Sequence, residues 1–305
     1  MSPTWDPVEL NMSDLDIDDP EEQMGSKDKN WIRIARDDRR WLVKIARTDV
    51  RDGTVSGEDW AEWIVQHVAA QLGMPTAEVR PAIFDGNRAT ASRSMLHDES
   101  ERLTHGNELL SARFEDYEQS IRGENPGYTL SAIEVALAGI PGPREFGEPF
   151  DAYDTFAGYL LCDALVSGRD RHHENWGAIR RGGERWLAPS FDHGNALGFQ
   201  ERDDRRARML ADESHLSRWL GRGTSPHFVG RPLLTDVAMS ALERASPEAR
   251  VYWWERLDAF DLETAEAVID LVPSDVMSDV SRRFVSSLLY TNRRRLLDGY
   301  RTPGF

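Results

Sequence analysis

Hydrophobic and polar positions alternate with a period of two in four short segments near the start of the chain. Residues 31–36 and 41–45 alternate on either side of a polar turn, which predicts the two strands of a hairpin. Residues 79–84 and 89–96 show the same alternation around a turn at Gly86. We therefore expect a small antiparallel sheet in this part of the chain.

Between the two predicted hairpins the apolar spacing becomes helical. Apolar side chains recur every three or four residues from Trp60 to Leu72, and Gly73 followed by Pro75 ends the run. Residues 56–59 have the form of a capping box, in which side chains of the first turn bond free backbone N–H groups. One helix is therefore expected beside the sheet.

Beyond His97 the composition turns helical. Residues 151–167 are apolar on most faces, which is typical of a buried helix, and Gly168 is placed to end it. Residues 176–179 and 186–191 flank a glycine turn and predict a further hairpin. More helices are expected near residues 205–220, 232–245, 248–257, 261–272 and 276–298.

The predicted elements divide the chain into two lobes. Residues 24–97 give a small antiparallel β-sheet lobe with one helix, and residues 98–305 give a larger, mostly helical lobe. The fold class is therefore α+β. Residues 1–23 carry many Asp and Glu residues and few apolar anchors, so we expect them to form an acidic, mobile tail.

The charge of the chain restricts its partners. The 305 residues carry a formal net charge of −16, and such a field repels nucleic acid phosphates and anionic lipids. Direct binding to nucleic acid or to a membrane is therefore not expected. The N-terminus lacks the basic and apolar regions of a signal peptide, and no apolar run approaches the length of a membrane span. We expect a cytoplasmic protein.

The loop after the predicted buried helix carries the most informative residues. Asp170 and Asn175 lie five residues apart in it, and Asp192 opens an Asp-x-Gly sequence directly after the hairpin predicted for residues 176–191. Phosphoryl transfer needs one carboxylate to orient or deprotonate the attacking hydroxyl, and an amide oxygen with another carboxylate to hold Mg²⁺. The spacing matches the protein-kinase signatures. It predicts Asp170 as the base and Asn175 and Asp192 as metal ligands.

Three features of the small lobe fit the same chemistry. Lys44 lies inside an apolar strand, where an unpaired ammonium would be costly, and Glu62 lies on an otherwise apolar stripe of the predicted helix. Each has an ordinary explanation as a surface charge, but together and in this order they favour a nucleotide site. A glycine turn that is able to close over phosphates precedes the first strand and contains Gly25, Ser26, Lys27 and Lys29.

These residues resemble the HipA-type kinases, a bacterial branch of the protein-kinase-like fold. The likeness runs from residue 24 to about residue 200, without the extra N-terminal subdomain of larger members. It includes the glycine loop, the Leu-Val-Lys strand ending at Lys44, the segment 69–75 after Glu62, and the segment 187–192. The resemblance implies a bilobal kinase fold and ATP with Mg²⁺ as cofactors. It also implies a protein serine or threonine as phosphate acceptor and an antitoxin or another regulator as a candidate partner.

Three alternative functions remain open. The sequence from Asp170 through His172 to Asn175 is also similar to a sequence in phosphatidylinositol kinases. This similarity makes His172 a second candidate base and a lipid a candidate substrate. The negative charge of the chain argues against a lipid. The His, Asp and Glu residues of this region would also suit a metal-dependent phosphohydrolase. A non-catalytic nucleotide sensor is the third alternative, although such a protein usually lacks one residue of the set Lys44, Asp170, Asn175 and Asp192, and all four are present.

Overall fold

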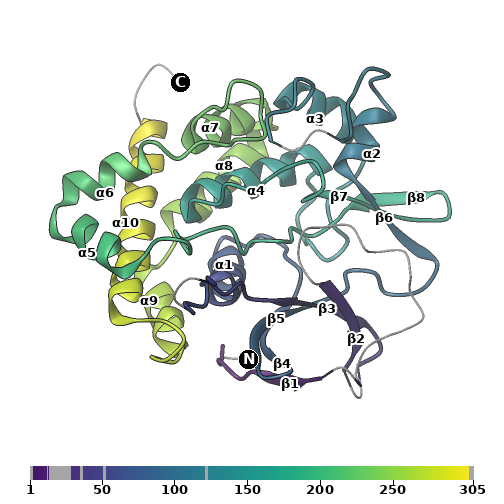
Figure 1. Cartoon of the computed structure of the whole chain (residues 1–305). Coiled ribbons are helices and arrows are strands. Elements are labelled where there is room, and N and C mark those ends of the chain that lie inside the picture. The colour runs from purple at the N-terminus through teal and green to yellow at the C-terminus, as the bar shows by residue number, and fades with distance from the viewer. Residues whose placement is uncertain are drawn as a thin grey trace.

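The computed structural model describes residues 3–11, 13, 29–34, 37–50, 53–120 and 123–301. Its small lobe is a five-stranded sheet in the order β1-β4-β5-β3-β2 (Figure 1). The strands are β1 (Val8–Leu10), β2 (Lys29–Arg33), β3 (Arg40–Ile45), β4 (Val79–Phe84) and β5 (Asn87–Arg93).

The sheet confirms both hairpins predicted from the alternating pattern. β2 pairs with β3 and β4 pairs with β5, and the β3–β5 contact joins the two hairpins, all antiparallel. The inward residues of these strands form a core of their own, in which Ile32, Trp41 and Val43 are fully buried. The period-two alternation therefore selects one face of the sheet for burial.

The first strand corrects the prediction of a mobile tail, made for residues 1–23, at Val8–Leu10. Val8–Leu10 form β1, which lies parallel to β4 with Val8 opposite Ala82. Trp5 packs edge-on against Trp63, with 5.1 Å between the ring centroids. The acidic composition hid these apolar anchors, since Trp5, Val8 and Leu10 are spread among charged residues. Residues 14–28 lie outside the described residues.

Helix α1 (Glu58–Gln71) lies between the sheet and the helical lobe (Figure 1). Its apolar side chains, among them Trp60, Ile64 and Val68, are buried in the core shared with the large lobe. The predicted capping box does not form: the N-cap is Gly57, without a side-chain hydrogen bond. Asp59, which a capping box would turn back to the helix start, instead binds Arg88 of β5.

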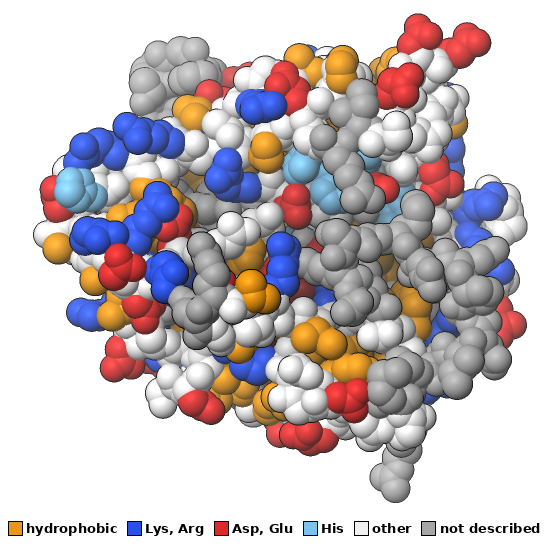
Figure 2. Space-filling view, in the orientation of Figure 1, with side chains coloured by type: hydrophobic (Ala, Val, Ile, Leu, Met, Phe, Trp, Pro, Cys, Tyr) orange, Lys and Arg blue, Asp and Glu red, His pale blue; other side chains and the backbone are white. Residues whose placement is uncertain are grey.

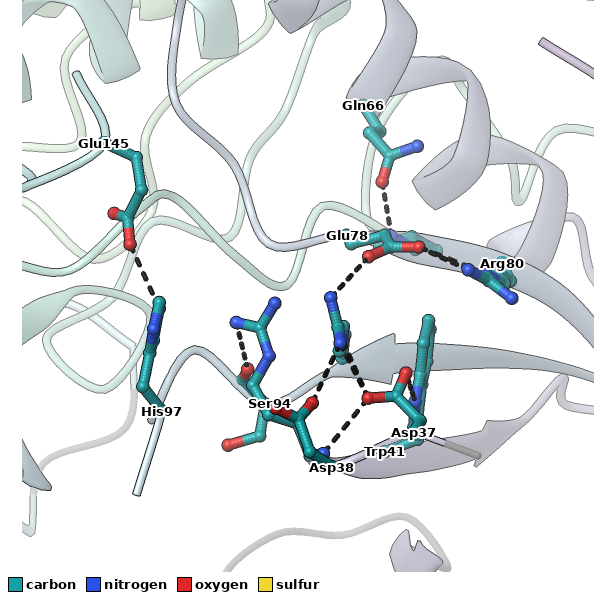
Figure 3. Close-up of polar contacts among 12 residues, drawn as sticks. Asp37, Asp38, Trp41, Gln66, Glu78, Arg80, Ser94, His97 and Glu145 are labelled. Atoms are coloured by element: carbon teal, nitrogen blue, oxygen red, sulfur yellow. Dashed lines mark hydrogen bonds and ion pairs between the residues drawn. The ribbon is translucent and has the colours of Figure 1, made fainter. Parts of the chain in front are cut away.

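Polar side chains at one edge of the sheet fix the turn between β2 and β3. Arg93 of β5 donates to Asp37 at 2.7 Å, and the indole N–H of Trp41 donates to the same carboxylate at 3.0 Å (Figure 3). Burial opposes ionisation of Asp37, but these hydrogen bonds hold its pKa well below the usual range. Gln66 of α1 accepts from the backbone N–H of Val79, which joins the helix to the sheet (Figure 3).

The large lobe consists of helices and a three-stranded antiparallel sheet in the order β6-β7-β8. Its strands are β6 (Glu101–His105), β7 (Gly177–Arg181) and β8 (Glu184–Leu187). Its helices are α2 (Gly106–Ser111), α3 (Leu130–Leu137), α4 (Ala152–Val166), α5 (Asp203–Ala211), α6 (Glu213–Leu220), α7 (Leu234–Arg244), α8 (Pro247–Asp258), α9 (Leu262–Leu271) and α10 (Asp279–Arg301).

Helix α4 is the centre of this lobe, and all of its residues are buried (Figure 1). Its end differs from the prediction. Ser167, and not Gly168, takes the left-handed conformation that ends the helix, with φ of 54°. The amide of Asn292 in α10 donates to the Ser167 hydroxyl at 2.9 Å and to the carbonyl of Leu165 at 3.0 Å. These contacts offset the strain of a left-handed residue that carries a side chain.

Two further differences concern the helices. The single helix expected near 205–220 is two helices, because the chain leaves helical geometry at Asp212, whose carboxylate caps α6 through the N–H of Ser214. Strand β6 and helices α2 and α3 carried no clear periodic signal. Within the described ranges, no helix is both long enough and apolar enough to cross a membrane.

Candidate functional site

The loop that follows α4 is held by a buried arginine. Arg171 donates to both carboxylate oxygens of Asp163 at 2.8 Å and to the carbonyl of Asn175 at 2.9 Å. Burial would lower the pKa of Arg171, but Asp163 raises it above the ordinary value. The phenol of Tyr128 donates to the carbonyl of Arg171 at 2.9 Å. The backbone that carries the predicted catalytic residues is therefore fixed from two sides.

Asp170, the predicted base, lies in this loop and binds a histidine far along the chain. Its Oδ1 atom is 2.9 Å from Nε2 of His227. Burial raises the pKa of Asp170, but the hydrogen bond from His227 and the charge of His172 lower it, and the net pKa is below the usual value. The carboxylate is therefore ionised at neutral pH and able to accept a hydrogen bond from a hydroxyl group.

Asn175 is buried beside Asp170. Its side-chain N–H donates to the carbonyl of Asp170 at 2.7 Å. This bond sets the orientation of the amide and leaves its oxygen as the acceptor. Asp170 and Asp192 both line one small hollow of the molecule. The structure thus brings two of the predicted carboxylates to one hollow and places the amide of Asn175 next to Asp170.

Lys44 and Glu62 of the small lobe meet Asp192 of the large lobe. The ammonium of Lys44 lies 2.8 Å from Oδ1 of Asp192 and 3.8 Å from Oε1 of Glu62. Only 8% of the lysine side chain is exposed. Burial would lower the pKa of Lys44, but Asp192 and Glu62 raise it above the ordinary value, so the ammonium stays charged. Three residues predicted separately from the sequence therefore form one charged cluster.

The predicted metal ligands suit Mg²⁺ better than a transition metal. Asn175 and Asp192 offer amide and carboxylate oxygens, which are ligands that Mg²⁺ prefers. Among the described residues, no group of three or more His, Cys, Asp or Glu side chains is arranged to hold a metal ion. Mg²⁺ commonly takes one or two protein oxygens and completes its shell with water and phosphates. The donor set therefore fits a metal that arrives with a nucleotide.

Histidine rings surround the loop. The ring of His172 is 5.2 Å from that of His227 and 6.2 Å from that of His173. In the space-filling view, histidine side chains gather on the face above the sheet lobe (Figure 2). Nδ1 of His172 accepts from the N–H of Glu174 at 3.1 Å, and burial lowers the pKa of His172. The second predicted base is thus bonded within its own loop.

The predicted phosphate loop lies mostly outside the described residues. Gly25, Ser26 and Lys27 are not among them, and of Lys29 only the backbone is described. Lys29 is the first residue of β2, and its Cα pairs with that of Lys44. The backbone therefore enters the sheet beside the site lysine. The role of these loop residues stays a prediction.

His227 is the main residue that the motifs missed. It lies between α6 and α7, outside every matched segment, and reaches Asp170 through the fold alone. Tyr128 and Asp163 were also missed. A buried Asp163 within the apolar α4 was the one available signal, since an unpaired carboxylate is costly inside a helix core.

A β-sheet lobe with a buried lysine, facing a helical lobe with an Asp/Asn loop and a second aspartate, defines a protein-kinase-like architecture. No model of a known protein family matches the chain. The serine/threonine-protein kinase CtkA of Helicobacter pylori is 20% identical over 292 residues, which cover 92% of this chain and 84% of that protein.

Two solved structures resemble the fold. The crystal structure of the H. pylori proinflammatory kinase CtkA matches with a TM-score of 0.75 and 17% identity over 96% of both chains. HipA of Shewanella oneidensis, solved with HipB and operator DNA, matches with a TM-score of 0.54 and 13% identity over 85% of this chain and 60% of HipA. The chain is thus similar in sequence to CtkA and shares the fold of both solved structures, which confirms the predicted resemblance and the α+β fold class.

Proposed function

We propose that this protein transfers the γ-phosphate of ATP to a serine or threonine hydroxyl of a protein substrate. The observation that supports this most strongly is the contact of Lys44 with Asp192, because it joins the two lobes at the hollow that Asp170 also lines. A cationic side chain next to a metal-binding carboxylate and a separate base is the arrangement that phosphoryl transfer requires.

Each residue has a distinct role in this proposal. Lys44 binds the nucleotide phosphates, and Glu62 limits the movement of the ammonium. Asn175 and Asp192 would hold Mg²⁺, which when bound offsets the negative charge that develops on the phosphates. Gly25, Ser26 and Lys27, which precede β2, and Lys29 at its start would cover the phosphates.

Asp170 acts on the acceptor hydroxyl. Its free carboxylate oxygen accepts the hydroxyl hydrogen, and the proton passes to Asp170 as the acceptor oxygen forms its bond to the γ-phosphorus. The bond between the γ-phosphorus and the bridging oxygen breaks, and ADP leaves. Positioning and charge stabilisation supply most of the rate in reactions of this kind.

A protein acceptor and a regulatory partner remain part of the proposal. HipA was solved with HipB and operator DNA, and the present chain spans 60% of the HipA chain. An antitoxin-like or other regulatory protein is thus a candidate partner. The net charge of −16 argues that any contact with DNA would be made by that partner and not by this chain.

The test is incubation of the purified chain with Mg²⁺ and γ-labelled ATP, with casein as a generic acceptor and with vesicles of phosphatidylinositol in a parallel reaction. We expect label on serine or threonine of a protein. Release of phosphate alone would support a phosphohydrolase, label in lipid a lipid kinase, and ATP binding without turnover a sensor. Asp170→Asn and Asp192→Asn should each abolish the labelling while leaving the thermal unfolding transition in place.

A further inference from the structure

His227 contacts the predicted base although no kinase motif includes it. It lies in the connection between α6 (Glu213–Leu220) and α7 (Leu234–Arg244). Its Nε2 atom is 2.9 Å from Oδ1 of Asp170. The side chain of His227 is 16% exposed and that of Asp170 is 39% exposed, so the histidine approaches the carboxylate from the protein side.

The backbone on both sides of His227 is fixed. The N–H of Asn125 donates to the carbonyl of His227 at 3.1 Å, and the N–H of Val229 donates to the carbonyl of Tyr128 at 3.2 Å. Phe228 packs on the ring of Tyr128 with 4.5 Å between the centroids. The histidine is therefore placed by a short segment that is bonded to the chain before α3.

The same tyrosine holds the loop that carries Asp170. Tyr128 is buried, accepts from the indole N–H of Trp176 at 2.9 Å and donates to the carbonyl of Arg171. One residue thus supports both partners of the His227–Asp170 contact. The distance between His227 and Asp170 is therefore set by the contacts of the buried Tyr128, and it does not depend on two independent surface loops.

We propose that His227 is a positioning residue, which donates from Nε2 to Oδ1 of Asp170 and thereby aims the other carboxylate oxygen at the acceptor hydroxyl. The inference rests on the proposed function. Within the described part of the chain, no other side chain forms a hydrogen bond with the carboxylate of Asp170. Without His227 the carboxylate would be free to rotate about its side-chain bonds, and misplaced catalytic groups are costly.

The surroundings of Nδ1, the second ring nitrogen of His227, favour a role in positioning Asp170 over a role in proton transfer. Nδ1 is buried and has no hydrogen-bond partner among the described residues. With no group of the described chain bonded to Nδ1, the ring has no hydrogen-bonded path along which to pass a proton from Asp170 onward. The ring is therefore suited to donate one hydrogen bond from Nε2 to the carboxylate of Asp170.

A matched pair of variants tests the inference. His227→Gln keeps an N–H donor at similar reach, whereas His227→Met has a similar length and no donor. His227→Met should lower kcat about 10- to 100-fold with the KM for ATP nearly unchanged, because only the orientation of the Asp170 carboxylate is lost. The glutamine variant should retain kcat to within about fivefold of the wild type.

Equal losses in the two variants would overturn the inference, and so would a methionine variant with wild-type kcat. Thermal unfolding is measured for each variant, and if His227→Met does not fold, His227→Leu takes its place in the same comparison. Asp170→Asn is measured in parallel. If Asp170→Asn keeps wild-type turnover, the proposed function fails. If Asp170→Asn is inactive while His227→Met is normal, only the role of His227 fails.

Discussion

The ammonium of Lys44 lies closer to Asp192, at 2.8 Å, than to Glu62, at 3.8 Å. The lysine therefore pairs across the two lobes with the carboxylate that we assign to the metal. In the proposed reaction, Mg²⁺ and ATP would separate this pair, with Lys44 binding the phosphates and Asp192 holding the cation. The pair thus keeps both charges satisfied before the nucleotide enters.

Lys44→Met should lower the rate of phosphate transfer about 100-fold or more and raise the KM for ATP, because the phosphates lose their cation and two carboxylates are left facing each other. Initial rates over a range of ATP concentrations measure both effects. Glu62→Gln is the matched control. It keeps the shorter contact of Lys44 and should cost less activity than Lys44→Met. Equal losses would show that the longer contact is as important as the shorter one.

Much of this arrangement could be predicted because each part follows from local sequence. The alternation of apolar and polar residues predicted the hairpins. A kinase was indicated by the order of five residues along the chain: Lys44, Glu62, Asp170, Asn175 and Asp192. The structure brings Lys44, Glu62 and Asp192 into one cluster. Their chemical roles remain predictions.

What could not be predicted depends on contacts between distant segments. His227 reaches Asp170 only through packing, and no spacing rule connects the two residues. Ser167 takes the left-handed conformation where its hydroxyl accepts a hydrogen bond from Asn292 of a far helix. The capping box at residues 56–59 fails because Asp59 finds a stronger partner in Arg88. In each case tertiary structure overrides the local signal.

Arg171→Met should destabilise the folded chain by about 3–5 kcal/mol, because it leaves the carboxylate of Asp163 buried without its partner. Both side chains are almost completely buried. The free energy of unfolding is measured by urea denaturation. The double variant Arg171→Met with Asp163→Leu removes both charges and should recover much of the loss. A double variant as unstable as the single one would indicate that the arginine acts mainly through its bond to the carbonyl of Asn175.

Trp5→Ala should lower the free energy of unfolding by about 1–3 kcal/mol. The indole of Trp5 packs edge-on against Trp63 of α1. Trp63 directly follows Glu62, which contacts Lys44. Glu9→Ala is the control, since Glu9 is exposed on the adjacent strand β1 and its replacement should have little effect. An unchanged midpoint of urea denaturation for Trp5→Ala would mean that the N-terminal segment contributes nothing to the stability of α1.

The stability of the chain should fall as the pH is lowered below about 6.5, partly through His67 of α1. The ring packs against Trp63 with 4.5 Å between the centroids, and its Nε2 is buried with no hydrogen-bond partner in the described part of the chain. Burial lowers the pKa of His67 below 6.5 in the folded state. Below pH 6.5 the unfolded chain therefore binds a proton at this position that the folded chain does not, and the free energy of unfolding decreases until the folded pKa is reached.

Urea denaturation at pH 7.5, 6.5 and 5.5 measures this decrease. His67→Gln removes the titrating ring and should show a smaller loss of stability between pH 7.5 and 5.5 than the wild type, whatever its stability at pH 7.5. His215→Gln is the control for replacement of a histidine by glutamine, because His215 is half exposed on α6. If His67→Gln loses as much stability as the wild type on acidification, the acid sensitivity arises from other groups and the buried ring of α1 is protonated without cost.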